Sequence, residues 1–279
     1  MILGLAFLMS SCGDDSTSLS LSFQGLEDLG SDYVYEGWLI VDGAPVSSGR
    51  FSIDSNGNPT KSSFDLDQEN VDQATTFVLT IEPATGDDPA PSDVHILAGD
   101  FSGSSAALTV GHSAALNDDF TGVAGSFILA TPTDADMNNE DSGIWFLDNS
   151  SGSPVPGLTL PTLPAGWAYE GWAVVDGTPI STGTFSSATE ADDAAPYSGD
   201  MAGPPFPGED FLQNAPDGLS FPLSLLGGAG VISIEPVPDN STAPFTLKPL
   251  VGNISADAAV HSVQNMNANL SFPTGSVNR

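Results

Sequence analysis

The chain has 279 residues, which is long enough for one large domain or two ordinary domains with buried cores. Four basic residues face 36 acidic ones, so the formal net charge at neutral pH is −32. Because phosphate groups are bound by Lys and Arg, this balance excludes nucleic acid and anionic membrane surfaces as main partners. The hydrophobic fraction of 40% is typical of a folded protein, and the simplest interpretation of the acidity is solubility.

The first residues differ from the rest of the chain. Residues 2–9 form an apolar run that is too short to span a bilayer, which takes about 20 residues. The run ends at Ser10-Ser11-Cys12-Gly13, a small-residue sequence typical of a processing site. We therefore expect residues 1–11 to be a signal peptide and residues 12–18 to be a polar tether.

Cys12 is the only cysteine, which excludes an internal disulfide. Its position resembles the lipobox of bacterial lipoproteins, with Met9 where leucine is usual. The resemblance implies that Cys12 carries a lipid, and that this lipid anchor is the protein's contact with the membrane. The sequence Gly13-Asp14-Asp15 resembles the export signal of surface-exposed lipoproteins. The expected location is therefore the cell envelope, on the outer membrane, with exposure at the cell surface.

After the tether the sequence predicts β-structure. Leu19, Leu21 and Phe23 alternate with serines, which is the period-2 pattern of a half-buried strand. The pair Asp42-Gly43 is typical of a tight hairpin turn, whose central residues need positive φ. In this first unit, residues 19–118, we expect further strands at residues 33–41, 46–53, 77–81, 94–97 and 106–110. Helical periodicity is confined to residues 66–76 and 114–120.

One block of sequence occurs twice. Residues 33–51 and 167–185 are identical at 11 of 19 positions, and both contain Tyr-Glu-Gly-Trp followed by Val-Asp-Gly. A second pair of blocks follows in the same order, because residues 79–83 correspond to residues 232–236 and both end in Glu-Pro. Such a repeat indicates one supersecondary unit used twice.

We therefore expect an all-β fold of two tandem β-sandwich-like repeats with few or no helices. The second repeat takes residues 158–279, and a β connecting segment, residues 119–157, joins the two. The strands expected in that segment, residues 126–130 and 143–147, either extend the first unit's sheet or bridge to the second unit. The second repeat also has a Pro- and Gly-rich insertion, residues 188–218, of a length usual for functional or disordered loops.

The repeated blocks resemble a known family. The sequence from Tyr35 to Gly43, followed by Pro45-Val46-Ser47 and Gly49, is similar to the extracytoplasmic C-terminal domain of anti-sigma-K factors. The second family block is an aliphatic strand ending in Glu-Pro, a polar loop with prolines and a closing hydrophobic-Gly. In this sequence the block corresponds to residues 78–83, 87–91 and 97–99, and parts of it recur at residues 232–236 and 250–252. The resemblance implies an all-β domain outside the cytoplasm.

Anti-sigma factors also carry a cytoplasmic sigma-binding region and a membrane-spanning helix, neither of which this sequence shows. We therefore expect this chain to contain only the outer, sensory domain, present in two copies and anchored to the membrane by a lipid. Its expected partner is another protein of the envelope, rather than a cytoplasmic sigma factor.

Trp38 and Trp172 lie at the centre of the repeated motif. If exposed, they are stacking platforms for a sugar or a peptide, with Glu36 and Glu170 as hydrogen-bond acceptors. If buried, they are core residues that set the register of the hairpin. Because both copies keep the tryptophan where the family uses it for framework, we favour the second interpretation.

One acidic loop has the spacing of a cation site. Asp134, Asp136 and Asn138 place oxygen ligands at alternate positions, as calcium loops do. Trp145 stands at the twelfth position, where an EF-hand has a bidentate Glu, so this is not an EF-hand. A solvated acidic loop is favoured over a calcium site. We expect weak calcium binding at most, and no other cofactor.

No motif selects catalytic residues. The sequence contains no nucleophile elbow, HExxH helix, P-loop or Rossmann glycine fingerprint. Glu82 and Glu235, each at a strand end before proline, are expected to cap backbone N–H groups. The predicted function is that of a non-catalytic, lipid-anchored envelope protein that acts by protein–protein contacts. The alternative is a surface adhesin or glycan-binding module that uses exposed aromatics and the insertion; a secreted hydrolase is least favoured.

Lipidation of Cys12 can be tested by metabolic labelling with an alkyne fatty acid. We expect in-gel fluorescence after click ligation to mark the wild-type protein. The Cys12→Ala variant has no thiol to carry the lipid and should lose the mark, whereas Ser11→Ala keeps a small residue at the processing site and should retain it. An unlabelled wild-type protein would contradict the prediction.

Overall fold

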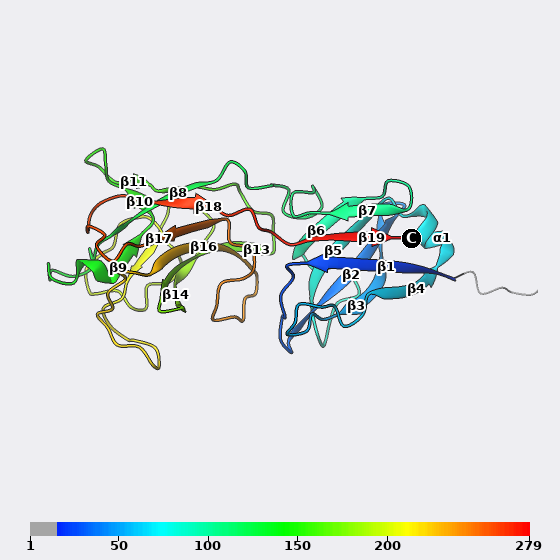
Figure 1. Ribbon diagram of the computed structural model, residues 1–279, viewed down its shortest axis with the longest axis horizontal. Coiled ribbons are helices and arrows are strands. Elements are labelled where there is room, and N and C mark those ends of the chain that lie inside the picture. Colours follow the sequence, from blue (N-terminus) through cyan, green and yellow to red (C-terminus); the bar gives the residue numbers. More distant parts are fainter. Residues whose placement is uncertain (1–15) are drawn as a thin grey trace, which may run out of the picture.

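The protein has two lobes arranged along its long axis (Figure 1). The computed structural model describes residues 16–279, so the expected signal peptide and Cys12 lie outside the described residues. The helices of residues 16–279 are one short α-helix, α1 (Gln68–Gln73), and one 3-10 turn, η1 (Glu140–Ser142); the other elements are strands. The expected all-β, sandwich-like fold is confirmed. In this part of the chain, no helix is both long and apolar enough to cross a membrane.

The first lobe is a β-sandwich of two four-stranded antiparallel sheets, with the orders β4-β1-β19-β7 and β3-β2-β5-β6. Their strands are β1 Ser16–Gln24, β2 Tyr33–Val41, β3 Ala44–Phe51, β4 Ser63–Asp67, β5 Thr76–Pro83, β6 His95–Asp100, β7 Ser105–Leu108 and β19 Thr274–Asn278. Leu19, Leu21 and Phe23 are the buried residues of β1, as their alternation predicted. Phe23 stacks on Phe51 of the other sheet, with ring centroids 5.3 Å apart.

The second lobe is built on one nine-stranded sheet that folds over itself. Its order is β14-β13-β16-β17-β18-β8-β9-β15, and β12 pairs with β8. The strands are β8 Ala124–Leu129, β9 Gly143–Trp145, β12 Leu158–Thr159, β13 Trp167–Val175, β14 Thr178–Phe185, β15 Gly208–Asp210, β16 Ala229–Pro236, β17 Leu250–Asn253 and β18 Gln264–Ala268; β10 (Leu147–Asp148) and β11 (Val155–Pro156) form a separate pair. A Cβ on Gly230 of β16 would lie 2.8 Å from Ile144 and 3.3 Å from Phe127. Strands β8 and β9 therefore pack face to face with β16.

The repeated sequence builds the same sheet in each lobe. The orders β3-β2-β5-β6 and β14-β13-β16-β17 are equivalent, and both first hairpins have a bulge, at Gly37/Trp38 and at Gly171/Trp172. Both turn pairs adopt the positive φ that the sequence predicted, with +49° and +78° at Asp42-Gly43 and +50° and +80° at Asp176-Gly177. A Cβ on either motif glycine would lie 2.5 Å or 2.7 Å from a buried aromatic ring, so only glycine fits there.

One segment lies elsewhere than expected, and two others take positions that the sequence left open. Strand β19 belongs by sequence to the second repeat, but it pairs with β1 and β7 in the first lobe, where its Val277 is fully buried. The strands of residues 119–157 join the sheet of the second lobe rather than that of the first. The insertion, residues 188–218, is not a free loop, because β15 pairs with β9.

Local structure agrees with the helix predictions in one of two places. Helix α1 lies within residues 66–76 and begins at Asp67, whose carboxylate accepts the N–H groups of Glu69 and Asn70. Residues 114–120 form turns instead of a helix. Asp118 and Asp119 there bind backbone N–H groups two residues ahead, which competes with helical hydrogen bonding. The expected tether is shorter than residues 12–18, since β1 begins at Ser16.

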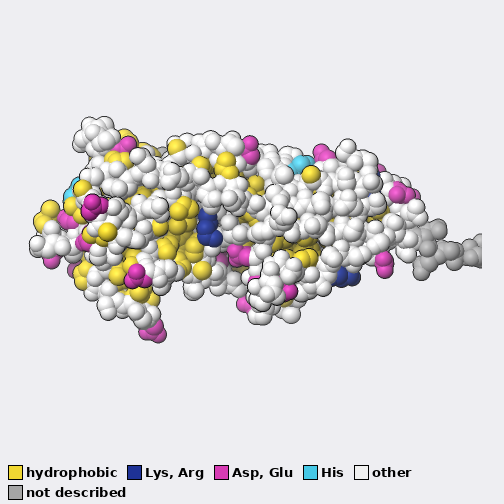
Figure 2. Space-filling model, viewed as in Figure 1, with side chains coloured by type: hydrophobic (Ala, Val, Ile, Leu, Met, Phe, Trp, Pro, Cys, Tyr) yellow, Lys and Arg dark blue, Asp and Glu magenta, His cyan; other side chains and the backbone are white. Residues whose placement is uncertain are grey.

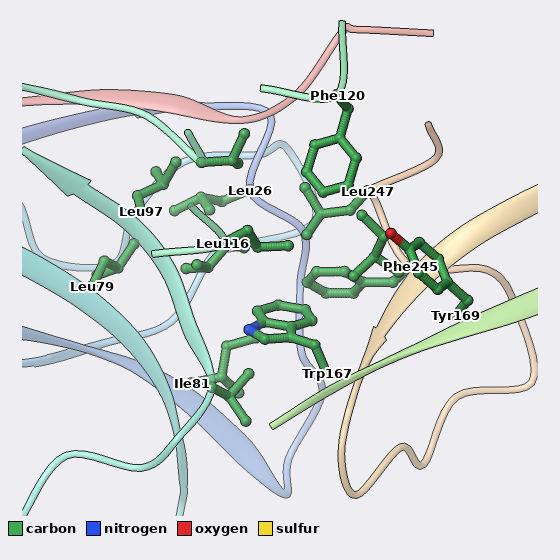
Figure 3. Close-up of a cluster of buried hydrophobic side chains, with 14 of the residues drawn as sticks. Leu26, Leu79, Ile81, Leu97, Leu116, Phe120, Trp167, Tyr169, Phe245 and Leu247 are labelled. Atoms are coloured by element: carbon green, nitrogen blue, oxygen red, sulfur yellow. The ribbon is translucent and has the colours of Figure 1, made fainter. Parts of the chain in front are cut away.

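The two lobes share one hydrophobic core. Trp167 and Phe245 of the second lobe lie in a continuous cluster with Ile81 and Leu116 of the first (Figure 3). Two hydrogen bonds also cross the junction, from Asn240 Nδ2 to Asp32 Oδ2 at 3.3 Å and from Thr246 Oγ1 to the carbonyl of Gly25 at 3.0 Å. The repeats therefore form one body.

The contact between the lobes can be tested at Gly166. Its φ is +83°, and a Cβ there would lie 2.6 Å from the carbonyl oxygen of Asp93 in the first lobe. Gly177 is a matched control, because its φ is +80° and no atom lies within 4 Å of its Cβ position. Both Gly→Ala substitutions carry backbone strain of about 1 kcal/mol, and Gly166→Ala adds a clash that costs roughly 1–3 kcal/mol more.

We therefore expect Gly166→Ala to lower the free energy of unfolding clearly more than Gly177→Ala, as measured by urea denaturation. Equal losses for the two variants would show that the lobes do not pack together at this point.

Candidate functional site

In the first lobe, the motif tryptophan ends a chain of hydrogen bonds inside the sheet. Trp38 Nε1 donates to Thr80 Oγ1 at 2.9 Å, and the Thr80 hydroxyl donates to the carboxylate of Glu82. Glu82 Oε1 also accepts the backbone N–H of Ser92 at 2.9 Å. The buried carboxylate thus caps the loop that returns to β6, as the sequence predicted.

The second lobe repeats this chain. Trp172 Nε1 donates to Ser233 Oγ at 2.7 Å, and Ser233 donates to Glu235. Glu235 Oε1 accepts the backbone N–H of Phe245 at 2.9 Å. The glutamate before proline has the same role in both copies.

These hydrogen bonds place both motif tryptophans in the core. Trp38 and Trp172 are 3% and 1% exposed. Stacking on a sugar or peptide needs an exposed ring face, and neither ring offers one.

In the first lobe, the guanidinium of Arg50 lies between two carboxylates. Nε of Arg50 lies 3.4 Å from Oε2 of Glu36, the glutamate of the repeated motif. The other end of the same guanidinium lies 3.6 Å from Oδ2 of Asp87, in the loop after β5. Arg50 therefore links the first hairpin to that loop.

The second lobe has equivalent acids but no equivalent arginine. Thr184 stands at the position that corresponds to Arg50. Glu170, the motif glutamate, lies close to Glu235 and to Asp239 in the loop after β16. One carboxylate oxygen from each of these three residues lies within 4.8 Å of the other two. We call Glu170, Glu235 and Asp239 the Glu170 cluster.

Most of the Glu170 cluster is buried. Glu170 and Glu235 are 6% and 1% exposed, and Oε2 of each finds no hydrogen-bond partner among residues 16–279. Burial raises the pKa of Glu170 to about 7 and that of Glu235 to about 8. Asp239 is exposed, and Glu170 borders a pocket of about 460 Å³ beside Trp172, so solvent reaches the edge of the cluster.

The loop of residues 134–138, whose spacing predicted a calcium site, has its carboxylates hydrogen-bonded to neighbouring asparagines. Asp134 Oδ2 accepts from Asn139 Nδ2 at 2.8 Å. Asp136 Oδ1 accepts from both the backbone N and the Nδ2 of Asn138, at 3.0 and 2.7 Å. Asn138 thus directs its amide nitrogen, not its oxygen, at Asp136. Calcium binding at Asp134, Asp136 and Asn138 stays a prediction.

The insertion contributes two buried acids that the sequence did not single out. Glu209 and Asp210 of β15 are both 0% exposed. Asp210 accepts from Trp145 Nε1 at 2.6 Å and from the backbone N of Thr133 at 2.9 Å, while Glu209 accepts from the Ser198 hydroxyl. Burial raises the pKa of Glu209 to about 7. The Asp210 bonds fasten the insertion to the rest of the second lobe, whereas the Glu209 bond lies within the insertion. In the sequence, the two acids stand between two phenylalanines, in Phe-Pro-Gly-Glu-Asp-Phe.

A cleft of about 730 Å³ lies between the lobes. Its floor is apolar and buried or half-buried, formed by Leu29, Tyr33, Ile81, Val94 and Phe245. Its rim is acidic, formed by Glu27, Asp28, Asp32, Asp93 and Asp239. Burial raises the pKa of Glu27 to about 7, although Lys248 nearby opposes the shift. Figure 2 shows hydrophobic side chains on both sides of the junction, with acidic and basic side chains between them. We call this the inter-lobe cleft.

The protein is an all-β, sandwich-like protein in which the same four-stranded arrangement occurs once in each lobe. Residues 6–95 match a family described as anti-sigma-K factor rskA, C-terminal. The resemblance of the first unit's motifs to this family is thereby confirmed over that range. The matched range reaches the first residue of β6 and does not include the second lobe. No curated protein and no solved structure matches the chain.

The buried acids of the insertion predict how stability depends on pH. Burial raises the pKa of Glu209 from 4.5 to about 7 and that of Asp192 from 3.8 to about 8. Between the ordinary and the raised values the folded protein keeps protons that the unfolded chain has lost. The free energy of unfolding should therefore fall as the pH rises from about 5 to about 8.

Urea denaturation across this pH range measures the effect. Glu209→Gln removes one titrating group, so we expect it to flatten the pH dependence, whereas Asp65→Asn on the exposed face of β4 should leave it unchanged. A wild-type stability that rises with pH over this range would be inconsistent with protonated acids in the insertion.

Proposed function

We propose that the protein is a non-catalytic, extracytoplasmic interaction module whose inter-lobe cleft binds an extended segment of another envelope protein. The match of residues 6–95 to the C-terminal domain of an anti-sigma-K factor supports an extracytoplasmic location and a protein partner. We also propose that a lipid on Cys12 anchors the module to the outer membrane. The observation that carries the proposal is the inter-lobe cleft, which combines an apolar floor with an acidic rim.

The chemistry of the cleft selects the partner segment. Apolar side chains gain free energy when they leave water for a floor such as that formed by Ile81, Val94 and Phe245. Lys and Arg are attracted by the carboxylates of the rim and by a chain whose net charge is −32. The volume of about 730 Å³ falls within the usual range of ligand pockets and admits a few side chains. The partner segment is therefore basic and apolar.

The glycan-binding alternative has less support. That function requires exposed aromatic platforms, and the two motif tryptophans are core residues. The insertion, to which the alternative also assigned binding, uses its buried Asp210 to attach itself to Thr133 and Trp145 of the second lobe.

The proposed function is tested with short peptides of defined chemistry. We expect fluorescence anisotropy to show that labelled peptides alternating Arg with Leu or Phe bind the wild-type protein at low salt, and that the same peptides with Glu in place of Arg do not. The Asp28→Lys/Asp93→Lys variant reverses two charges of the rim and should weaken binding at least about tenfold.

The matched control is Asp65→Lys/Asp72→Lys, which changes the net charge equally on β4 and α1, away from the cleft. It should weaken binding by less than about threefold, because its charges act only at long range through screening salt. Equal losses in the two variants would mean that the peptides follow net charge rather than the cleft, and would refute the proposal.

A further inference from the structure

Equivalent carboxylates have different neighbours in the two lobes. In the first lobe, the guanidinium of Arg50 lies between Glu36 and Asp87. In the second lobe, Thr184 occupies that position, and its backbone N and hydroxyl both donate to Asp193, at 3.0 and 2.7 Å. Thr184 is thus engaged outside the Glu170 cluster and brings no positive charge to it.

No other basic side chain replaces the arginine. Lys248 is the one basic residue on the strands and loops of the second lobe between residues 119 and 273. Its Nζ donates to the carbonyl of Phe245 at 2.6 Å, and it forms no ion pair with the three carboxylates among the described residues. Among the described residues, the Glu170 cluster therefore holds three acids with no Lys or Arg in ion-pair contact.

Two oxygens of the Glu170 cluster lack any partner. Buried polar atoms in folded proteins are nearly always hydrogen-bonded, and a buried carboxylate is costly unless it is paired or coordinates a metal. Oε2 of Glu170 and Oε2 of Glu235 are buried and unpaired, although Oε1 of each accepts a serine hydroxyl. The remaining oxygens are those that an external cation would use.

The spacing of the cluster fits a calcium ion. Calcium takes oxygen ligands at about 2.3–2.6 Å, so two ligands of one ion lie at most about 5 Å apart. The three carboxylate oxygens lie within 4.8 Å of one another, and the adjoining pocket of about 460 Å³ has room for water to complete the coordination. Magnesium demands a tighter octahedron and usually keeps most of its water, so it fits three wide-set carboxylates less well.

We propose that the Glu170 cluster is a calcium site, in which the ion occupies the place that Arg50 takes in the first lobe. The ion joins β13, through Glu170, to the loop after β16, through Asp239. That loop also forms part of one wall of the inter-lobe cleft. The site is separate from the loop of residues 134–138 and needs no ligand from it.

Terbium luminescence excited through tryptophan provides a site-specific test on the purified full chain. Trp172 is linked to Glu235 through Ser233, so an ion in the Glu170 cluster lies close to an indole that sensitises terbium. We expect saturable luminescence that calcium displaces at about 10⁻⁴ to 10⁻³ M, the range of extracellular calcium modules, and that magnesium displaces only at higher concentration. Displacement by magnesium at the same concentration as calcium would refute the assignment to a calcium site.

Asp239→Asn and Asp217→Asn form a matched pair. Both residues are exposed and both substitutions remove one charge, but Asp217 lines the pocket without belonging to the cluster. We expect Asp239→Asn to weaken calcium affinity at least about tenfold and Asp217→Asn to leave it within about twofold. Equal affinities would place the ion elsewhere on the acidic surface and overturn the proposal.

Exchange of the lobe-specific residues gives a second test that does not depend on removing an acid. Thr184→Arg should abolish the luminescence and the calcium-dependent rise in melting temperature, because the guanidinium takes the ion's place. Arg50→Thr is the control, because no group of three acids lies within ligand distance in the described part of the first lobe, and it should leave the calcium affinity unchanged. If Thr184→Arg folds with wild-type calcium affinity, the proposal is wrong.

Discussion

Each lobe buries a glutamate at the end of a central strand, Glu82 in the first and Glu235 in the second. Because a buried carboxylate needs donors, each glutamate accepts from a hydroxyl, which in turn accepts from the tryptophan indole, and from one backbone N–H of the loop that leads to the next strand. These bonds hold the tryptophan in the core and tie the loop to the end of the strand.

The two copies of the sheet share the hydrogen bonds from tryptophan through a hydroxyl to glutamate, but they differ in the charges around the motif glutamate. The first copy carries its own cation, Arg50, whereas the second has Thr184 and three acids that share a small volume. The second copy has also acquired the insertion, whose Glu209 and Asp210 are buried among donors of the same lobe. One scaffold thus supports a lobe whose motif glutamate is paired with an arginine and a lobe whose motif glutamate lies among other acids.

The hairpins could be predicted because their turn pairs and alternating apolar residues are local signals, and the family resemblance followed from the same residues. The position of strand β19 could not be predicted from local signals. Val277 is its one buried residue, and its partner β1 lies at the other end of the described chain. The Glu170 cluster was hidden for a similar reason: its acids come together only through the pairing of β13 with β16. Glu209 and Asp210 contradict the usual exposure of acids, so composition pointed the wrong way.

Strand β19 lies between β1 and β7, so the first lobe combines strands from the two ends of the described chain, which are synthesised at very different times. Until residues 274–278 emerge, β1 and β7 present open edges with unpaired backbone groups, and closing them encloses a loop that contains the whole second lobe. The second lobe also closes a long loop, because β8 pairs with β18, but all its strands lie within the contiguous residues 124–268. The lobe that is made first is therefore the lobe that finishes folding last, and its completion depends on the second lobe bringing β19 back to it.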